Sequence, residues 1–163
     1  MSVTQDILRT YRAPRAVLRR QLAGGVREDR ALVYLLAGCL LIFVSTLPGL
    51  SRDAFIDPEV PLEARIGASL LAWMILMPLV FYTLAGISHL IARVLGGQGI
   101  GFGARLALFW ALLAASPLWL LYGLVNGFVG AGAGRTLVGV LCLAAFGIFW
   151  LSGLVEAESA HKD

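Results

Sequence analysis

The hydrophobic residues of this chain fall into four long runs, separated by short polar segments. The runs cover residues 31–50, 66–95, 104–128 and 136–155. Each run is long enough to cross about 30 Å of hydrocarbon, because an α-helix rises about 1.5 Å per residue. The pattern therefore predicts an all-α fold, a polytopic membrane helical bundle with four transmembrane helices over residues 31–155.

Two prolines inside these runs bear on the number of crossings. Pro78 lies in the second run, which exceeds the bilayer thickness, so this helix is expected to tilt and kink. Pro117 divides the third run into halves that are too short to cross separately, which favours one kinked span. The alternative is a five-span bundle, in which the run splits at Pro117 and the C-terminus lies on the opposite side.

The polar segments between the runs predict short connections. Residues 51–65 form an acidic outer loop, in which Pro58 and Pro61 forbid a long helix. Residues 96–103 are rich in glycine, which predicts a flexible inner turn before the third span.

Residues 1–30 form a basic, amphipathic arm before the first span. Ser2 and Gln5 form a capping box, which predicts the start of a helix. Pro14 is expected to break or kink this helix, and Gly24–Gly25 to end it. Its apolar side chains recur every three or four residues, as in a helix that lies in the membrane interface. An arm docked on a partner would show the same pattern, so both alternatives stay open.

Composition places the chain among membrane proteins. Hydrophobic residues make up 59% of the chain and charged residues 14%, and the mean hydropathy is +0.84. Soluble domains are typically about half apolar and a quarter charged. Cys39 and Cys142 lie within apolar runs, so they are expected to act as small hydrophobes and not as a disulfide.

The basic residues predict the orientation of the chain. Seven arginines precede residue 31, and basic residues that flank membrane spans stay on the cytoplasmic side. The N-terminus is therefore expected in the cytoplasm, and four crossings bring a cytoplasmic tail, residues 156–163, to the same side. No cleavage site follows the first run, which is expected to act as an uncleaved anchor. The position of the arginines directly before a span argues against a nucleic-acid partner.

His89 and Arg93 are the ionisable residues closest to a predicted span interior. They are four residues apart, share a helix face and lie near the inner end of the second span. Two interpretations stay open: anchoring at the water interface, or a proton or ligand role. The predicted spans contain no carboxylate, and the sequence has no catalytic or metal-binding motif, so we expect no enzyme, no metal site and no cofactor.

Two further sets of residues are candidates for contacts with lipid or protein. Basic clusters near the inner interface bind the anionic lipids of the cytoplasmic leaflet. The head-group candidates are Arg9, Arg12, Arg15, Arg19, Arg20, His89, Arg93 and Arg105. Gly123 and Gly127 form a G-x-x-x-G pattern that lets helices approach closely. This approach serves either packing within the bundle or association with a second membrane protein.

Three stretches of the chain resemble a known family. They are residues 6–15 (DILRTYRAPR), residues 89–97 (HLIARVLGG) and residues 103–110 (GARLALFW). They are similar to the bacterial branch of the Yip family of Ypt-interacting membrane proteins, in a compact form like those of alphaproteobacteria. The resemblance implies an integral membrane domain without known catalysis, in the bacterial inner membrane. Eukaryotic members are implicated in Rab-GTPase traffic and membrane shaping. The family is usually described with five spans, whereas this chain supports four more readily.

Three functions remain as hypotheses. The leading one is a non-enzymatic interaction, organising or accessory subunit of a larger inner-membrane complex, because small-residue faces and a basic arm are present. The alternative is a lipid-binding, lipid-handling or passive conduit protein that uses the kinks at Pro78 and Pro117. The third is an enzyme acting on a quinone or lipid, for which the sequence offers only His89 and Tyr82.

Overall fold

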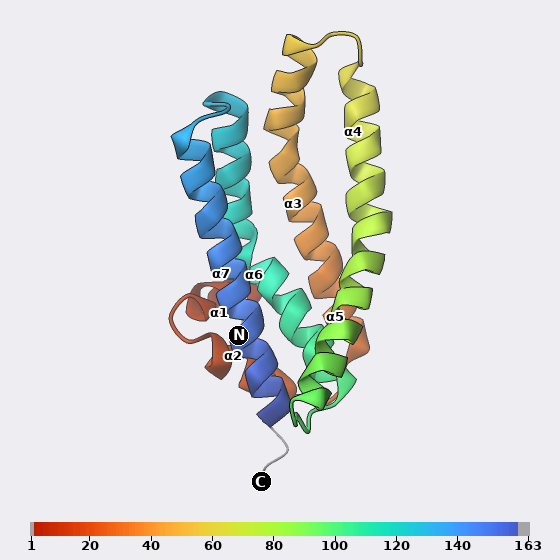
Figure 1. The fold of residues 1–163 in the computed structure, drawn as a ribbon, viewed down its shortest axis with the longest axis vertical. Coiled ribbons are helices and arrows are strands. Elements are labelled where there is room, and N and C mark those ends of the chain that lie inside the picture. Colours follow the sequence, from red (N-terminus) through yellow and green to blue (C-terminus); the bar gives the residue numbers. More distant parts are fainter. Residues whose placement is uncertain (1, 160–163) are drawn as a thin grey trace.

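The computed structural model describes residues 2–159, and every regular element in that range is a helix. Two short helices precede a bundle of longer ones (Figure 1). The elements in chain order are α1 (Val3–Thr10), α2 (Pro14–Leu22), α3 (Glu28–Ile56), α4 (Leu62–Leu71), the π-helical segment η1 (Ala72–Leu76), α5 (Met77–Val94), α6 (Gly101–Phe128) and α7 (Ala133–Ser159).

The prediction of an all-α bundle with four membrane-spanning helices is confirmed. Among the described residues, α3, the continuous helix Leu62–Val94, α6 and α7 are long and apolar enough to cross a membrane. α6 runs without interruption through Pro117, so the third apolar run is one helix and the five-span alternative does not apply.

The helices are longer than the apolar runs alone predict. α3 continues past residue 50 to Ile56, and α4 begins at Leu62, so the connection between them is residues 57–61 and not 51–65. The polar residues Ser51, Arg52 and Asp53 do not stop the helix, which ends at Ile56, two residues before Pro58. Asp57 has left the helical conformation (φ −126°, ψ 89°), as expected of a residue that precedes proline.

The kink expected at Pro78 takes the form of a π-helical segment. η1 ends directly before α5, which has Pro78 in its first turn. Pro78 has no N–H, so it cannot donate to the carbonyl four residues earlier. The amide of Met77 donates instead to the carbonyl of Ala72, five residues back, which is the π-helical pattern. The helix therefore continues through the proline with one wider turn.

α6 lies at the centre of the bundle. It contacts α3, α5 and α7, and residues 102–116 are buried except for the half-buried Arg105. Phe109 packs edge-on against Tyr82 of α5, and Trp110 against Tyr34 of α3, with ring centroids 4.9 and 5.0 Å apart. One end of α6 is therefore enclosed on all sides.

The N-terminal arm supplies part of that enclosure. Pro14 separates α1 from α2, and the two helices pack on α6 and α7. Thr10 Oγ1 accepts a hydrogen bond of 3.0 Å from Trp110 Nε1, and Leu18 is only 1% exposed. The sequence left open whether the apolar face of the arm covers the membrane interface or a protein. In the structure, this face packs on the chain's own helices α6 and α7.

Tyr11 connects the arm to the kink region of α6. Its hydroxyl donates a 3.0 Å hydrogen bond to the carbonyl of Ala114, and its ring packs edge-on against Phe149 of α7, 5.0 Å away. Pro117 has no N–H, so the carbonyl of Leu113 lacks its usual intrahelical donor and the ladder is weakened nearby. Tyr11 therefore adds a hydrogen bond to α6 at the residue next to the carbonyl that Pro117 leaves without a donor.

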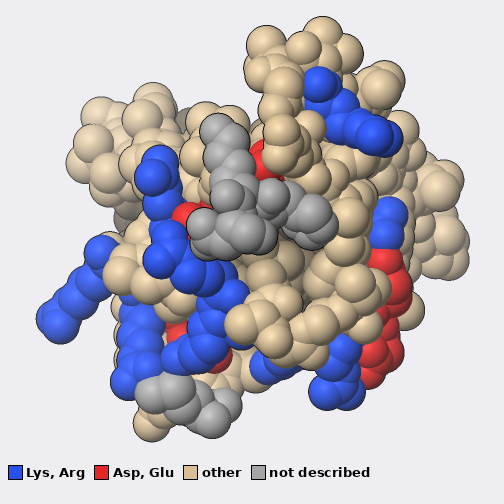
Figure 2. All heavy atoms as spheres, turned by 90° about the horizontal axis from the view of Figure 1, so that it is seen from below, with Lys and Arg blue, Asp and Glu red and all other residues tan. Residues whose placement is uncertain are grey.

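The two ends of the bundle differ, and we name them by their elements. The arm end carries α1, α2, the loop of residues 95–100 and the last turns of α7; the far end carries the loops of residues 57–61 and 129–132. Figure 2 looks onto the arm end, where arginine side chains gather around the periphery and acidic side chains lie among them.

Candidate functional site

The side chain of Glu158 joins three elements at the arm end. Its Oε1 lies 3.0 Å from Nδ1 of His89 on α5, and its Oε2 accepts a 3.0 Å hydrogen bond from the amide of Gly99. The backbone carbonyl of Glu158 also accepts the amide of Gln98, at 3.2 Å. The His89 and Glu158 side chains are 19% and 9% exposed. Glu158 therefore ties the end of α7 to α5 and to loop 95–100.

Glycines allow the loop to approach α7 this closely. Gly96 has φ = 90°, in the left-handed region that favours glycine. A methyl group at Gly97 would press on the Glu158 carboxylate, and one at Gly99 would clash with the carbonyl of Ala157. The glycine-rich segment is therefore packed directly against the end of α7.

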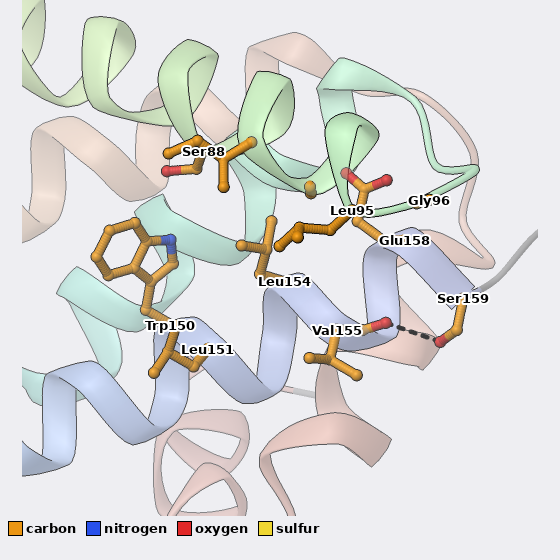
Figure 3. Close-up of a pocket in the computed structure, with 12 residues that line it drawn as sticks. Ser88, Leu95, Gly96, Trp150, Leu151, Leu154, Val155, Glu158 and Ser159 are labelled. Atoms are coloured by element: carbon orange, nitrogen blue, oxygen red, sulfur yellow. Dashed lines mark hydrogen bonds between the residues drawn. The ribbon is translucent and has the colours of Figure 1, made fainter.

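A cleft of about 520 Å³ opens between α5 and α7 beside this junction (Figure 3). Its walls are mostly apolar side chains. Glu158 and Ser159 stand at one end of the cleft, and Trp150 stands at the other. The volume and the lining of this cleft are typical of pockets that bind small molecules. In such pockets, a few polar groups fix the orientation of a mostly apolar ligand. The apolar lining residues include Ile91, Leu95, Leu151, Leu154 and Val155.

A second contact joins α7 to the arm. Arg19 binds Glu156 through two hydrogen bonds, of 2.5 and 3.1 Å. The hydrogen bond to Glu156 and the charge of that carboxylate raise the pKa of Arg19 above its ordinary value. Two-point pairing of this kind fixes direction as well as distance, so the arm and the end of α7 hold one another in place.

The basic residues predicted near the second and third spans have different binding partners. His89 meets Glu158. Arg93 is exposed on α5, directly after Ala92, which lines the cleft. Arg105 pairs with Glu28, with a 3.3 Å hydrogen bond from Nε, and so joins α6 to α3. His89 and Arg105 both lie beside Gly101 at the start of α6, but each binds the carboxylate of a different helix.

The arginines of the arm also divide into groups. Arg9, Arg12 and Arg20 line a hollow between α1 and α2. Arg15 is exposed on α2 and does not line this hollow, and Arg19 faces Glu156. The five predicted head-group candidates of the arm therefore have three different environments.

Gly123 and Gly127 lie in the contact between α6 and α3. A methyl group at Gly123 would clash with the carbonyl of Ser45, and one at Gly127 would clash with Pro48. Both glycines are needed for close approach of two helices of the same chain, as small residues at membrane helix contacts generally are. The face they form is covered by α3.

Glu156 and Glu158 were missed by sequence reasoning, which assigned residues 156–163 to a tail. The structure continues α7 to Ser159 and buries both carboxylates at the arm end; residues 160–163 lie outside the described part. The available signal was the absence of any glycine or proline between Gly153 and Ser159, since nothing there ends a helix.

The fold places the chain among polytopic α-helical membrane proteins, by the length and apolar composition of its helices. A scan against models of known protein families finds no match, and neither the curated proteins nor the solved structures contain a similar protein. The resemblance to the Yip family therefore stays a prediction.

Proposed function

We propose that this protein binds a membrane lipid, or another amphiphile of membrane origin, in the cleft between α5 and α7. The observation that carries the proposal is the cleft itself: about 520 Å³, with apolar walls along two membrane-spanning helices and its carboxylate at one end. An amphiphile has the same division into an apolar chain and a polar head group.

The chemistry of the head group follows from the polar end of the cleft. Lipid tails are as apolar as the cleft walls, so burying a chain in a membrane protein gives little selectivity by itself. Contacts at the Glu158 end therefore decide which lipid binds. A buried carboxylate repels an anionic head group and favours one that donates hydrogen bonds, such as a hydroxyl or an ammonium.

A substitution that fills the cleft tests this proposal. Ala92 lines the cleft, whereas Ala144 is exposed on α7 away from it. We expect Ala92→Phe to lose lipid that the wild-type protein retains after detergent extraction, measured by native mass spectrometry, and Ala144→Phe to keep it. Equal retention of the same lipid by both variants would reject the cleft as the binding site.

The proposal assigns the arm end to the cytoplasmic side of a bacterial inner membrane. Nine arginines of the described chain lie at the arm end, against three at the far end, namely Arg52, Arg65 and Arg135. Basic segments that flank membrane spans are kept on the cytoplasmic side, so this excess of arginine supports a cytoplasmic arm end. A periplasmic reporter fused after residue 163 should be inactive, and a cytoplasmic reporter fused there should be active.

The second candidate is an interaction or accessory subunit in a larger membrane complex. The observation that favours it is the sparse packing of α4 and η1, in which no residue is buried. Extraction of tagged protein from its host in mild detergent, followed by mass spectrometry, should then yield a membrane protein in fixed stoichiometry. Free monomer alone would count against this candidate.

A further inference from the structure

The carboxylate of Glu158 differs from that of Glu156, the other buried carboxylate at the end of α7. Glu156 is neutralised by Arg19, which binds it through two hydrogen bonds. Glu158 binds the imidazole of His89 and the amide of Gly99, and no arginine or lysine among the described residues pairs with it. Its side chain is 9% exposed and lines the cleft. The negative charge at this end of the cleft is therefore balanced only if His89 carries a proton.

Glu158 can still accept hydrogen bonds from a ligand. A carboxylate has lone pairs for about four hydrogen bonds. The structure shows one partner for each oxygen: Nδ1 of His89 for Oε1 and the amide of Gly99 for Oε2, both at 3.0 Å. Figure 3 shows the carboxylate at the end of the cleft, beside Leu95 and Gly96. A head group at this end of the cleft therefore meets an acceptor that two donors already hold in place.

The surroundings of this carboxylate favour a positively charged donor over a neutral one. Leu95, Leu154 and Val155 line the cleft together with Glu158, and the attraction between opposite charges grows as the local dielectric falls. A hydroxyl offers a hydrogen bond alone, whereas an ammonium offers a hydrogen bond and the opposite charge. Glu158 has already lost most of its hydration on folding, so on binding mainly the ammonium has to lose water. An ammonium therefore gains more from this site than a hydroxyl.

The net charge of the site depends on His89. The charged groups next to His89 among the described residues are Glu158 of α7, Arg105 of α6 and, one turn further along α5, Arg93. Arg105 is itself paired with Glu28 of α3. Between about pH 5 and 8 an imidazole changes its charge, whereas a guanidinium group does not. A neutral His89 leaves Glu158 with its full negative charge, and a protonated His89 cancels that charge.

We propose that the Glu158 end of the cleft selects an amphiphile whose head group carries an ammonium, and binds it more tightly when His89 is neutral than when His89 is protonated. The inference rests on the proposed function, because it takes the cleft as the binding site. It adds the charge of the ligand and a condition for its release. Acid protonates His89, the pair of His89 and Glu158 becomes electrically neutral, and the ammonium loses its counter-charge.

Two probes with the same chain and different head groups test the inference. The purified protein in a maltoside detergent would be titrated with dodecylamine and with dodecan-1-ol by isothermal titration calorimetry, at about pH 8 and about pH 5.5. Binding that persists in Ala92→Phe, in which the cleft is filled, is subtracted as uptake by the detergent micelle. At the higher pH we expect the amine to bind about tenfold more tightly than the alcohol, as one favourable charge contact provides. At the lower pH the amine should lose about tenfold in affinity and the alcohol less than about twofold.

Two histidine substitutions identify the group that titrates. His89→Gln keeps an N–H donor for Glu158 and cannot gain a proton, so the amine should bind equally at both pH values. His161 is the other histidine of the chain, and His161→Gln should keep the pH dependence of the wild type. Melting temperatures show whether each variant is folded. The ratio of amine to alcohol affinity in the wild type needs no histidine variant, and its change with pH decides the matter if His89→Gln does not fold.

Three results would overturn the inference. Equal binding of amine and alcohol at the higher pH, with both lost in Ala92→Phe, would show that the cleft binds amphiphiles without selecting their charge, so that the proposed function stands alone. The same pH dependence in His89→Gln as in the wild type would show that another group titrates. Unchanged binding of both probes in Ala92→Phe would reject the cleft as the site, and the proposed function with it.

Discussion

The two ends of the bundle are held together by different interactions. At the arm end, residues 102–116 of α6 are almost wholly buried, and ion pairs or hydrogen bonds join neighbouring elements through Glu156, Glu158 and Arg105. At the far end, α4 and η1 have no buried residue. There, α3 packs closely on α6 at Gly123 and Gly127, and α6 also accepts hydrogen bonds from Arg52 of α3 and Arg135 of α7.

This difference separates two ways of holding membrane helices together. Within hydrocarbon there is little hydrophobic drive between helices, so the far end relies on close packing of small residues. At the arm end, polar groups find partners in the arm and in loop 95–100, and these bonds fix the position of elements that packing alone leaves free. The arm end therefore depends mainly on buried polar contacts, whereas the far end depends mainly on close packing, with hydrogen bonds of Arg52 and Arg135 added at its edge.

Adding a methyl group to the α3–α6 contact should have the largest effect on the far end. We expect Gly123→Ala to destabilise the protein by about 2 kcal/mol or more, because the new methyl group meets the Ser45 backbone, which has no room to move away. Thermal unfolding in detergent measures this. Gly147→Ala is the control: a methyl group there has no atom within 4 Å, and alanine favours a helix over glycine. Equal stability of the two variants would contradict the role of shape.

Removing the Glu158 carboxylate should loosen the arm end next. Glu158→Ala leaves His89 and the Gly99 amide without their partner, at a cost of about 1–2 kcal/mol for buried polar groups. Hydrogen exchange should rise in residues 95–100 while the α3–α6 contact stays protected. Glu63→Ala serves as control, since Glu63 is exposed at the start of α4. Unchanged exchange in loop 95–100 would show that the glycines alone hold the loop.

The docking of the arm should appear as a coupling of about 1 kcal/mol between Thr10 and Trp110. Thr10→Val and Trp110→Phe each remove one side of their 3.0 Å hydrogen bond; Trp110→Phe also removes buried volume, a cost that the cycle subtracts. A double-mutant cycle, with stability measured by thermal or denaturant unfolding, isolates the interaction free energy between the two side chains. Additive effects would mean that this hydrogen bond does not fix the arm.

The smallest effect is expected at the loop of the far end. Asp57 pairs with Arg65 at 2.8 Å, and the Asp57 side chain is 54% exposed. Exposed pairs contribute little, so Asp57→Asn should change stability by less than about 0.5 kcal/mol, and less still at high salt. A larger loss would show that this ion pair contributes more than exposed pairs usually do.

The sequence predicts the four spans, but it does not predict all helix ends or the contacts that the helices make. Apolar runs predict four spans because a span needs length and hydrophobicity, both of which are local properties. The break before α2 was predictable because Pro14 acts on its own backbone. The helix ends were less predictable, since polar residues at 51–56 and 156–159 extend a helix without making it apolar.

The candidate site depended on contacts between distant parts of the chain. His89 was identified because it lies near the end of an apolar run, but Glu158 is 69 residues away and was assigned to a tail. An amphipathic pattern in the arm predicts a covered face and does not say what covers it. The division of the arm's arginines into hollow, ion pair and exposed surface likewise needs the positions of α1 relative to α2 and of Glu156 relative to both.

The docking of the arm has a consequence for the order of events during synthesis. Arg19 and Glu156 are 137 residues apart in the chain, which a ribosome covers in roughly 7 to 27 seconds. For that interval the docking surface on α7 does not exist, and the arginines of the arm are free to act on the insertion machinery and on anionic lipids. On the proposed orientation, we expect these arginines to act first as a topology signal and, once α7 has been made, we expect Arg19 to bind Glu156 and hold the arm on the bundle.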